Sequence, residues 1–160
     1  MANRAESATT TVQETGGIGV REIVTAASAG FVGTVAMSPI LAVGWILGGV
    51  SPAAFESLAA LTGLGASLPL GVFIFVGGGT TTLPLLFVAL AMFMPGRTTT
   101  QKGVAFAAVV WTGWSIAFFT GQTGLTLVAF LVVGLLSHAV YGGVLGALYG
   151  RFASFPEYEV

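Results

Sequence analysis

The chain has 160 residues, of which 55% are hydrophobic and only 7% are charged, against roughly 25% charged residues in a typical soluble domain. A chain of this length buries only about 70% of its surface on folding, which excludes water as the main solvent for so apolar a protein. The net charge of −1 argues against nucleic acid as a partner. The absence of cysteine excludes disulfides, thiolate nucleophiles and iron–sulfur ligands.

Four long uncharged stretches dominate the sequence. A helix needs roughly 20 residues to cross about 30 Å of hydrocarbon, so each stretch is predicted to be a transmembrane helix. The predicted fold is an all-α integral membrane four-helix bundle over 23–151, between a flexible polar tail at 1–22 and a C-terminal tail at 152–160. The first tail has no apolar core of the kind found in a cleavable signal peptide. The predicted spans are about 23–48, 67–94, 103–119 and 125–150.

The basic residues all fall on one side of these four stretches: before the first, between the second and third, and after the fourth. The connections between the first and second stretches and between the third and fourth carry no Lys or Arg. Basic flanks resist translocation, so an excess of Lys and Arg marks cytoplasmic loops. The pattern predicts that the N- and C-termini are both cytoplasmic and that the chain is a multi-pass protein of the cell membrane. The five basic residues are Arg4, Arg21, Arg97, Lys102 and Arg151.

The connection between the first two spans contains a helix signal. Ser51 is a good N-cap and Pro52 suits the first helical position. Phe55, Leu58 and Leu61 follow at helical spacing. We therefore predict a short interfacial helix at 51–62 on the outer membrane surface, with an ordinary loop as the alternative.

The second span is the least regular, because it contains a Gly-Thr run at 77–82 followed by Pro84. One hypothesis is a single long helix that kinks near Pro84, which has no N–H and frees the carbonyl four residues earlier, at Thr80. The other hypothesis is a pair of half-helices that meet at an unwound Gly-Thr segment, as in some transporters. The run lacks the following Lys of a phosphate-binding loop.

Small residues recur along the first and fourth spans. In the fourth, Gly134, Gly142 and Gly146 recur in a row with His138, and in the first, Gly30 and Gly33 belong to a similar row. Small residues let helix backbones approach closely in lipid. We expect these rows to pack the first and fourth spans together, although either row is also compatible with contact to a neighbouring protein.

His138 is the only histidine and lies deep in the fourth span, with Tyr141 on the same helix face. An ionisable group within a membrane is a functional candidate. A haem contact is one possibility, although bis-histidine ligation is excluded. A His/Met pair could use Met37, Met92 or Met94, but nothing in the sequence places one of them opposite His138. The sequence offers no carboxylate within the spans for a proton relay. A structural hydrogen bond to another helix is the simplest alternative.

Trp111 and Trp114 lie inside the third span rather than at its ends. A buried indole needs a partner for its N–H, and no neighbour in the sequence supplies one obviously. The two rings are expected to pack at a helix contact or to stack on a cofactor of another subunit. With Pro84, His138 and Tyr141 they complete the set of candidate functional residues.

Three segments resemble a group of small four-span membrane proteins from haloarchaea. They are GFVGTVAM at 30–37, LPLLFVAL at 83–90 with a following Pro-Gly, and HAVYGGVLGALY at 138–149. Some members of that group are labelled as subunits of cytochrome c oxidase. The resemblance implies a respiratory association and includes His138 and Tyr141 in a motif, and it assigns no site residues. The Asp-free tails depart from a haloarchaeal composition.

These observations predict a protein without catalytic chemistry of its own and without a bound metal. The first hypothesis is an accessory or structural subunit of a larger membrane complex, such as a respiratory terminal oxidase, in contact with lipid and with other membrane subunits or copies of itself. The second is a small oligomeric transporter or channel that uses the Gly-Thr break of the second span. A third is a haem-binding membrane protein that uses His138.

Overall fold

The computed structural model describes residues 19–153, and within this range every regular element is helical. The predicted tails lie outside the described residues, except where 20–22 begin the first helix and 152–153 end the last. The helices are α1 (Val20–Ile46), α2 (Pro52–Ala60), α3 (Leu68–Gly77), α4 (Leu83–Leu90), α5 (Thr99–Ala117) and α6 (Gly124–Phe152), with a π turn η1 (Gly78–Thr82) between α3 and α4 and a 3₁₀ turn η2 (Ala91–Phe93) after α4.

Three of the described helical segments are long and apolar enough to cross a membrane: Val20–Ile46, Leu68–Phe93 and Gly124–Phe152. Four spans were predicted, and the difference is α5. This helix has 19 residues and starts at Thr99 rather than at 103, so its first turn takes in Gln101 and Lys102. These two polar residues lower the mean hydropathy of a helix that is only just long enough to cross a membrane.

The helix starts are set by local capping. At α5, the amide of Gln101 donates to the Thr98 hydroxyl at 3.2 Å, and the Gln101 side-chain oxygen accepts from the amide of Thr98 at 3.3 Å. This reciprocal capping box fixes the start of the helix. At α2, the Ser51 hydroxyl accepts from the amide of Ala53 at 3.2 Å and Pro52 follows it. A helix does therefore follow Ser51, as the sequence predicts.

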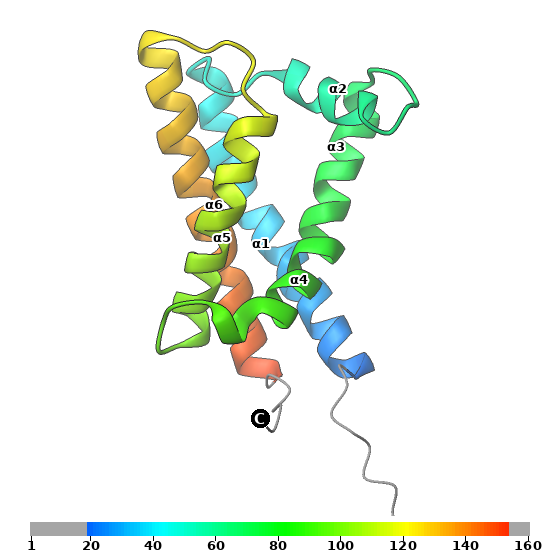
Figure 1. Cartoon of the computed structure of the whole chain (residues 1–160), viewed down its shortest axis with the longest axis vertical. Helices are drawn as coiled ribbons and strands as arrows, with labels where there is room; N and C mark the ends of the chain where they lie inside the picture. Colours follow the sequence, from blue (N-terminus) through cyan, green and yellow to red (C-terminus); the bar gives the residue numbers. More distant parts are fainter. Residues whose placement is uncertain (1–18, 154–160) are drawn as a thin grey trace, which may run out of the picture.

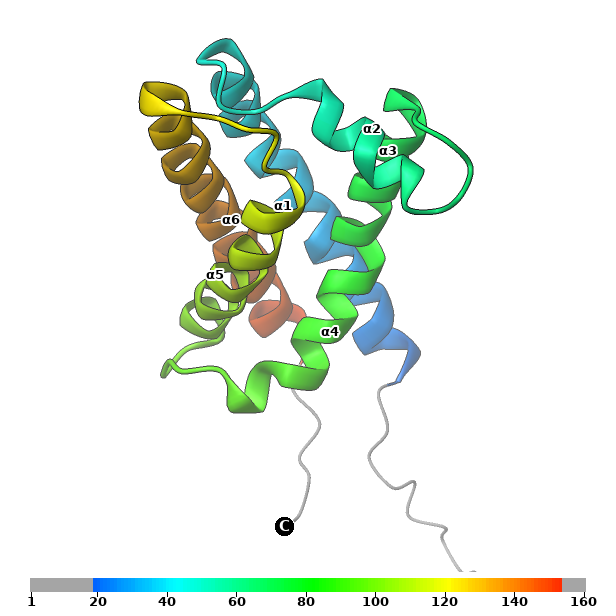
Figure 2. The same ribbon diagram turned by 45° about the horizontal axis from the view of Figure 1, so that its top comes forward.

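The long helices pack side by side in the order α5, α6, α1 and then η1 with α4 (Figure 1). Neighbours in this order are antiparallel. The helix α3 rises away from α5, and both views show the two helices apart (Figure 2). The helix α2 lies across the top of α3. The helices α3 and α5 are therefore not neighbours in this arrangement.

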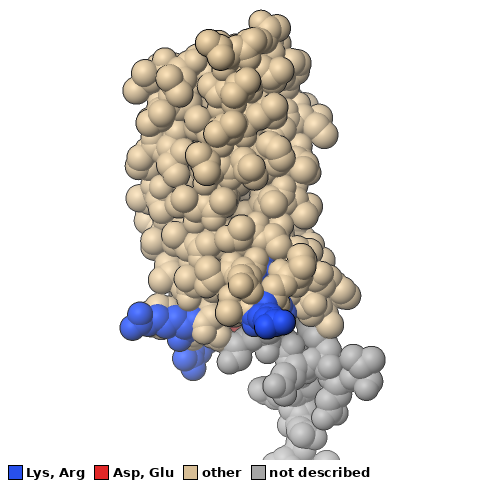
Figure 3. All heavy atoms as spheres, turned by 90° about the vertical axis from the view of Figure 1, so that its left-hand side faces the viewer, with Lys and Arg blue, Asp and Glu red and all other residues tan. Residues whose placement is uncertain are grey.

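The charged side chains lie at the two ends of the bundle. All four described basic residues sit at the end where α1 begins and α6 finishes, and Figure 3 shows this blue end below an uncharged surface. Arg21 donates to the carbonyl oxygen of Phe152 there, at 3.2 Å, which ties the two helix ends together. The described basic residues are Arg21, Arg97, Lys102 and Arg151.

The second span follows neither of the two sequence hypotheses completely. Its backbone stays helical through the Gly-Thr run, with φ −59° and ψ −45° at Gly78, so it does not unwind. The run instead forms the π turn η1, in which the amide of Leu83 donates to the carbonyl of Gly78, five residues back. Because Pro84 has no N–H to continue an α-helical ladder, a local change of hydrogen-bond register absorbs it.

The glycine rows pair differently from the prediction. The helices α1 and α6 do pack together, with Gly33 against Tyr141, but Gly142 and Gly146 of α6 lie against the backbone of α5. A Cβ on Gly142 would meet the carbonyl of Gly103, and one on Gly146 would meet that of Thr99. The row on α6 is therefore the seam with α5, while Gly30 of α1 lies against Pro84.

Candidate binding cavity

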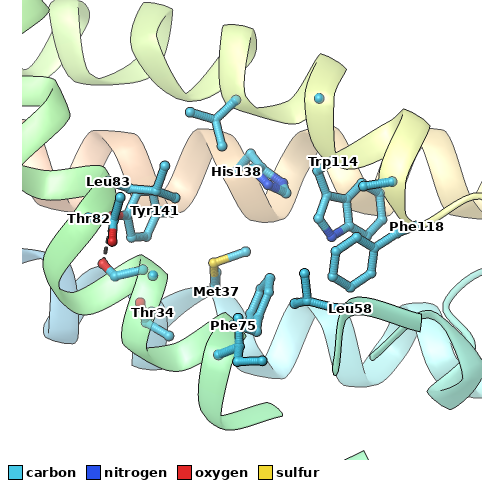
Figure 4. A pocket seen from close by; sticks show the side chains of 16 residues that line it. Thr34, Met37, Leu58, Phe75, Thr82, Leu83, Trp114, Phe118, His138 and Tyr141 are labelled. Atoms are coloured by element: carbon cyan, nitrogen blue, oxygen red, sulfur yellow. Dashed lines mark hydrogen bonds between the residues drawn. The ribbon is translucent and has the colours of Figure 1, made fainter. Parts of the chain in front are cut away.

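A cavity of about 390 Å³ lies at mid-height between the helices. Thr34 and Met37 of α1 and His138 and Tyr141 of α6 form its floor, and all four are buried. Residues of α3 and η1 line one wall and residues of α5 line the other (Figure 4). The cavity therefore occupies the place where α3 and α5 would meet in a closed bundle.

Aromatic side chains close the cavity toward α2. Phe55 of α2 packs edge-to-face on Phe75 of α3, with ring centroids 5.4 Å apart, and on Phe118 at 5.3 Å. Phe75 and Phe118 also meet directly, at 5.8 Å. Such edge-to-face pairs are a favourable aromatic geometry. Phe75 and Phe118, together with Leu58 of α2, thus line the end of the cavity nearest α2.

His138 has a defined tautomer in this cavity. The ring is only 4% exposed, and its Nδ1 lies 2.8 Å from the carbonyl oxygen of Gly134. A carbonyl oxygen only accepts, so Nδ1 carries the proton and donates. In a neutral imidazole the other nitrogen, Nε2, is then an acceptor. Figure 4 shows the His138 ring directed into the space in front of Trp114.

Trp114 forms the end wall beside His138. Its ring stacks on Phe130 at 4.6 Å and on Phe118 at 5.4 Å, and it lies 5.3 Å from the His138 ring, between centroids. The residue is 6% exposed, and its indole Nε1 has no hydrogen-bond partner among the described residues. Figure 4 shows this nitrogen on the cavity side of the ring. A buried donor without a partner is uncommon and calls for an explanation.

Tyr141 connects the cavity floor to the π turn. The hydroxyl donates to the carbonyl oxygen of Gly79 at 2.8 Å, and this bond is dashed in Figure 4. The Thr34 hydroxyl donates to the carbonyl of Gly30 at 2.9 Å. Both hydroxyl groups therefore donate to backbone carbonyls. Among the described residues at this end of the cavity, Nε2 of His138 and Nε1 of Trp114 remain as ring nitrogens without a hydrogen-bond partner.

The structure brings together three of the five candidate functional residues, namely Trp114, His138 and Tyr141. Trp111 does not line the cavity, and its Nε1 is unpartnered within 19–153. Pro84 is buried against Gly30 instead. Sequence reasoning missed Phe75 as a wall residue, because nothing along the chain indicates that α3 faces α5.

Metal-binding groups do not gather around the cavity. Within the part of the chain that the structure describes, no three His, Cys, Asp or Glu side chains come close enough to hold an ion. Met37, one of the methionines considered as a haem ligand opposite His138, does line the same cavity (Figure 4). The other two, Met92 and Met94, lie in or just after η2 at the basic end.

The fold and the cavity together define a class: an all-helical protein whose apolar helices are long enough to span a membrane. More particularly, the chain belongs to a family of unknown function, DUF6789, whose model matches residues 20–160. No curated protein matches the chain, and no solved structure does either.

Proposed function

We propose that the protein is a four-span membrane protein in which α5 is the fourth span and both termini face the cytoplasm. Glycine contacts hold α5 along α6 from Gly103 to Trp114, which supports a shared depth in the bilayer. The polar first turn of α5, with Lys102, belongs to the same end as Arg97 and suits the headgroup zone of the cytoplasmic side. The helix α2 at the opposite end would then lie at the outer surface.

Single introduced thiols test this topology cleanly, because the sequence contains no cysteine. Thr123→Cys lies at the outer end of α6 in this proposal, and Thr100→Cys lies in the first turn of α5. An impermeant maleimide added to intact cells should label the cysteine at 123 and leave the one at 100 unlabelled until the cells are opened. If α5 does not cross the membrane, both positions share one side and react alike.

We infer that this membrane protein is a non-catalytic accessory subunit of a larger membrane complex, such as a respiratory terminal oxidase. One observation carries the inference: the interior holds His138 as its single imidazole, while the described carboxylates, Glu22 and Glu56, lie at the ends of the bundle. Acid–base or redox chemistry normally needs several such groups close together. The resemblance to oxidase-labelled proteins supports the choice of complex.

Purification from native membranes tests this function. A tagged copy extracted in mild detergent should co-isolate a fixed set of other membrane subunits, in constant ratio across gel filtration. The control is Gly143→Ala, carried through the same procedure, because a Cβ there meets only ordinary contact with Val104, 3.6 Å away. A homogeneous preparation that contains this chain alone would refute an accessory role.

A transporter or channel is the second candidate, and the position of the π turn favours it. Gly78, Gly79 and Thr82 of η1 line the cavity, and π turns often occur at functional sites. Under this proposal the purified chain alone, reconstituted in liposomes, should accelerate the movement of a small neutral solute. Gly78 lines the cavity and a Cβ there meets nothing within 4 Å, so Gly78→Leu should narrow the cavity and reduce that flux, whereas an accessory subunit would show no flux in either form.

A further inference from the structure

We propose that the cavity binds a lipophilic molecule bearing a hydroxyl group, an alkylphenol or a long-chain alcohol, with the hydroxyl held between His138 Nε2 and Trp114 Nε1. This inference does not depend on the accessory role, but it rests on the proposed placement of α5 in the membrane. It rests on three features of the described residues: the size and opening of the cavity, the two free ring nitrogens, and the aromatic end wall.

The opening of the cavity decides what kind of molecule enters. Its floor residues are buried, while Thr82 on the η1 rim and Gly113 on the α5 rim are exposed. The mouth therefore lies on the side of the bundle at mid-height, far from both charged ends. In a membrane this mouth faces hydrocarbon, so the entering molecule is one dissolved in lipid. The volume of about 390 Å³ lies within the range of small-molecule pockets, roughly 300–1,000 Å³.

The free polar groups decide what functional group the molecule carries. Nδ1 of His138 donates to Gly134, so Nε2 needs a donor. The indole Nε1 of Trp114 is itself a donor without a partner in the described structure, so it needs an acceptor. A hydroxyl group supplies both, since its hydrogen goes to Nε2 while its oxygen accepts from Nε1. An ether or ketone supplies only the acceptor, and a hydrocarbon supplies neither.

The surrounding side chains favour a neutral molecule with an apolar body. Phe75 and Phe118 offer ring faces and edges beside Trp114, and none of the described residues that line the cavity is Lys, Arg, Asp or Glu. A charged ligand would be buried without a counter-ion, which is costly. Because the Trp114 ring already stacks on Phe130 and Phe118, a phenol ring would lie at its edge while its alkyl chain passes out between η1 and α5.

Equilibrium dialysis of the purified full-length chain in detergent tests the proposal, with protein-free micelles as the blank. Three matched probes are used: para-hexylphenol, para-hexylanisole, which lacks the hydroxyl hydrogen, and hexylbenzene, which lacks the oxygen. We expect saturable binding of one phenol per chain, about tenfold tighter than hexylbenzene, as two buried hydrogen bonds allow. The anisole should fall between them. Equal binding of all three would overturn the proposal and indicate an apolar site for acyl chains.

Variants assign the two hydrogen bonds. Trp114→Phe keeps an aromatic wall but loses the N–H, and His138→Phe loses the acceptor, so each removes one of the two bonds and should weaken phenol binding to between that of the original chain and that of hexylbenzene. Trp111→Phe is the matched control: its indole N–H is also unpartnered within 19–153, but it does not line the cavity, so it should bind phenol normally. A phenol preference that is undiminished in both cavity variants would refute the assignment. The three-probe comparison on the unaltered chain stands even if a variant fails to fold.

Discussion

The Tyr141 hydroxyl on α6 donates a 2.8 Å hydrogen bond to the carbonyl oxygen of Gly79 in the π turn, across 62 positions of the sequence. The amide of Leu83 is already used by Gly78, five residues back. In the same pattern the carbonyl of Gly79 faces the nitrogen of Pro84, which carries no hydrogen. Tyr141 therefore supplies the hydrogen bond that Pro84 withholds, and it joins the second span to α6 at the cavity.

Removing the hydroxyl should weaken the fold measurably. Tyr141 is 1% exposed, so in Tyr141→Phe the Gly79 carbonyl loses its donor where water has little access. Leaving a buried acceptor unsatisfied costs about 1–3 kcal/mol. We expect that decrease in the free energy of unfolding, measured by titration with a denaturing detergent while helix content is followed by circular dichroism.

Pro84→Ala tests whether the missing N–H of Pro84 is the reason that the Tyr141 hydroxyl stabilises the protein. It restores an N–H at position 84, which can donate within the turn and takes over the role of the Tyr141 hydroxyl. The cost of Tyr141→Phe should therefore be smaller in the Pro84→Ala background than in the original chain. An equal cost in both backgrounds would show that Tyr141 stabilises the protein for another reason, such as its packing against Gly33.

The sequence predicted the helices well because their limits depend on local chemistry. The long uncharged stretches, the Ser51-Pro52 start and the basic residues at one end all follow from neighbouring residues and correspond to the described helices. The exception is α5, whose capping box extends it backward to Thr99. The apolar length alone did not reveal that the helix takes in a polar turn.

The cavity and its hydrogen bonds were not predictable in this way. Which face of α6 meets α5 depends on the rotation of whole helices, and the glycine row has the same spacing whichever neighbour it meets. The freed carbonyl was expected at Thr80, four residues before Pro84. The π turn widens the step to five residues and places the bond of Tyr141 at Gly79 instead. The periodicity of the sequence does not predict that change in the hydrogen-bond register of the helix.

The seam between α5 and α6 predicts opposite effects for two adjacent glycines. In Gly142→Ala, the new Cβ would meet the carbonyl of Gly103 and lie 2.5 Å from the Cβ of Ala107, so the two helices must separate. Overpacking of this kind costs about 1–3 kcal/mol. In Gly143→Ala, the nearest atom is a methyl of Val104 at 3.6 Å, and the helix gains about 0.5–1 kcal/mol in conformational entropy.

Thermal unfolding of both variants in the same detergent checks this prediction. Gly142→Ala should lower the midpoint and Gly143→Ala should leave it equal or raise it. If both variants shift the midpoint in the same direction, the close approach of the two backbones at Gly142 is not what limits the side chain there.

The π turn makes a similar distinction between Gly78 and Gly79. A Cβ on Gly79 would lie 2.5 Å from the Thr34 hydroxyl of α1, whereas one on Gly78 meets nothing within 4 Å. Gly79→Ala forces that hydroxyl to move and threatens its bond to Gly30, so we expect a loss of about 1–2 kcal/mol. Gly78→Ala should be neutral. Chemical denaturation compares the two, and a larger loss at Gly78 would contradict the contact with α1.

Gln122 joins the two loops at the end of the bundle away from the basic residues. The residue is 8% exposed; its Nε2 donates to the carbonyl of Gly49 at 2.9 Å, and its Oε1 accepts from the amide of Thr120 at 2.8 Å. In Gln122→Glu, the carboxylate still accepts from Thr120 but can no longer donate to Gly49. We expect a loss of about 1–3 kcal/mol and faster amide hydrogen exchange in the loop at 47–51.

Gln101→Glu is the matched control for this change. The exposed Gln101 uses its side-chain oxygen to accept from the amides of Arg97, at 2.8 Å, and Thr98, at 3.3 Å. A carboxylate accepts equally well and is favoured at a helix N-terminus, so stability and exchange should be unchanged. The same chemical substitution is thus predicted to be harmful where the amide donates and harmless where it only accepts. Equal tolerance at both positions would mean that the bond to Gly49 contributes nothing to holding the two loops together.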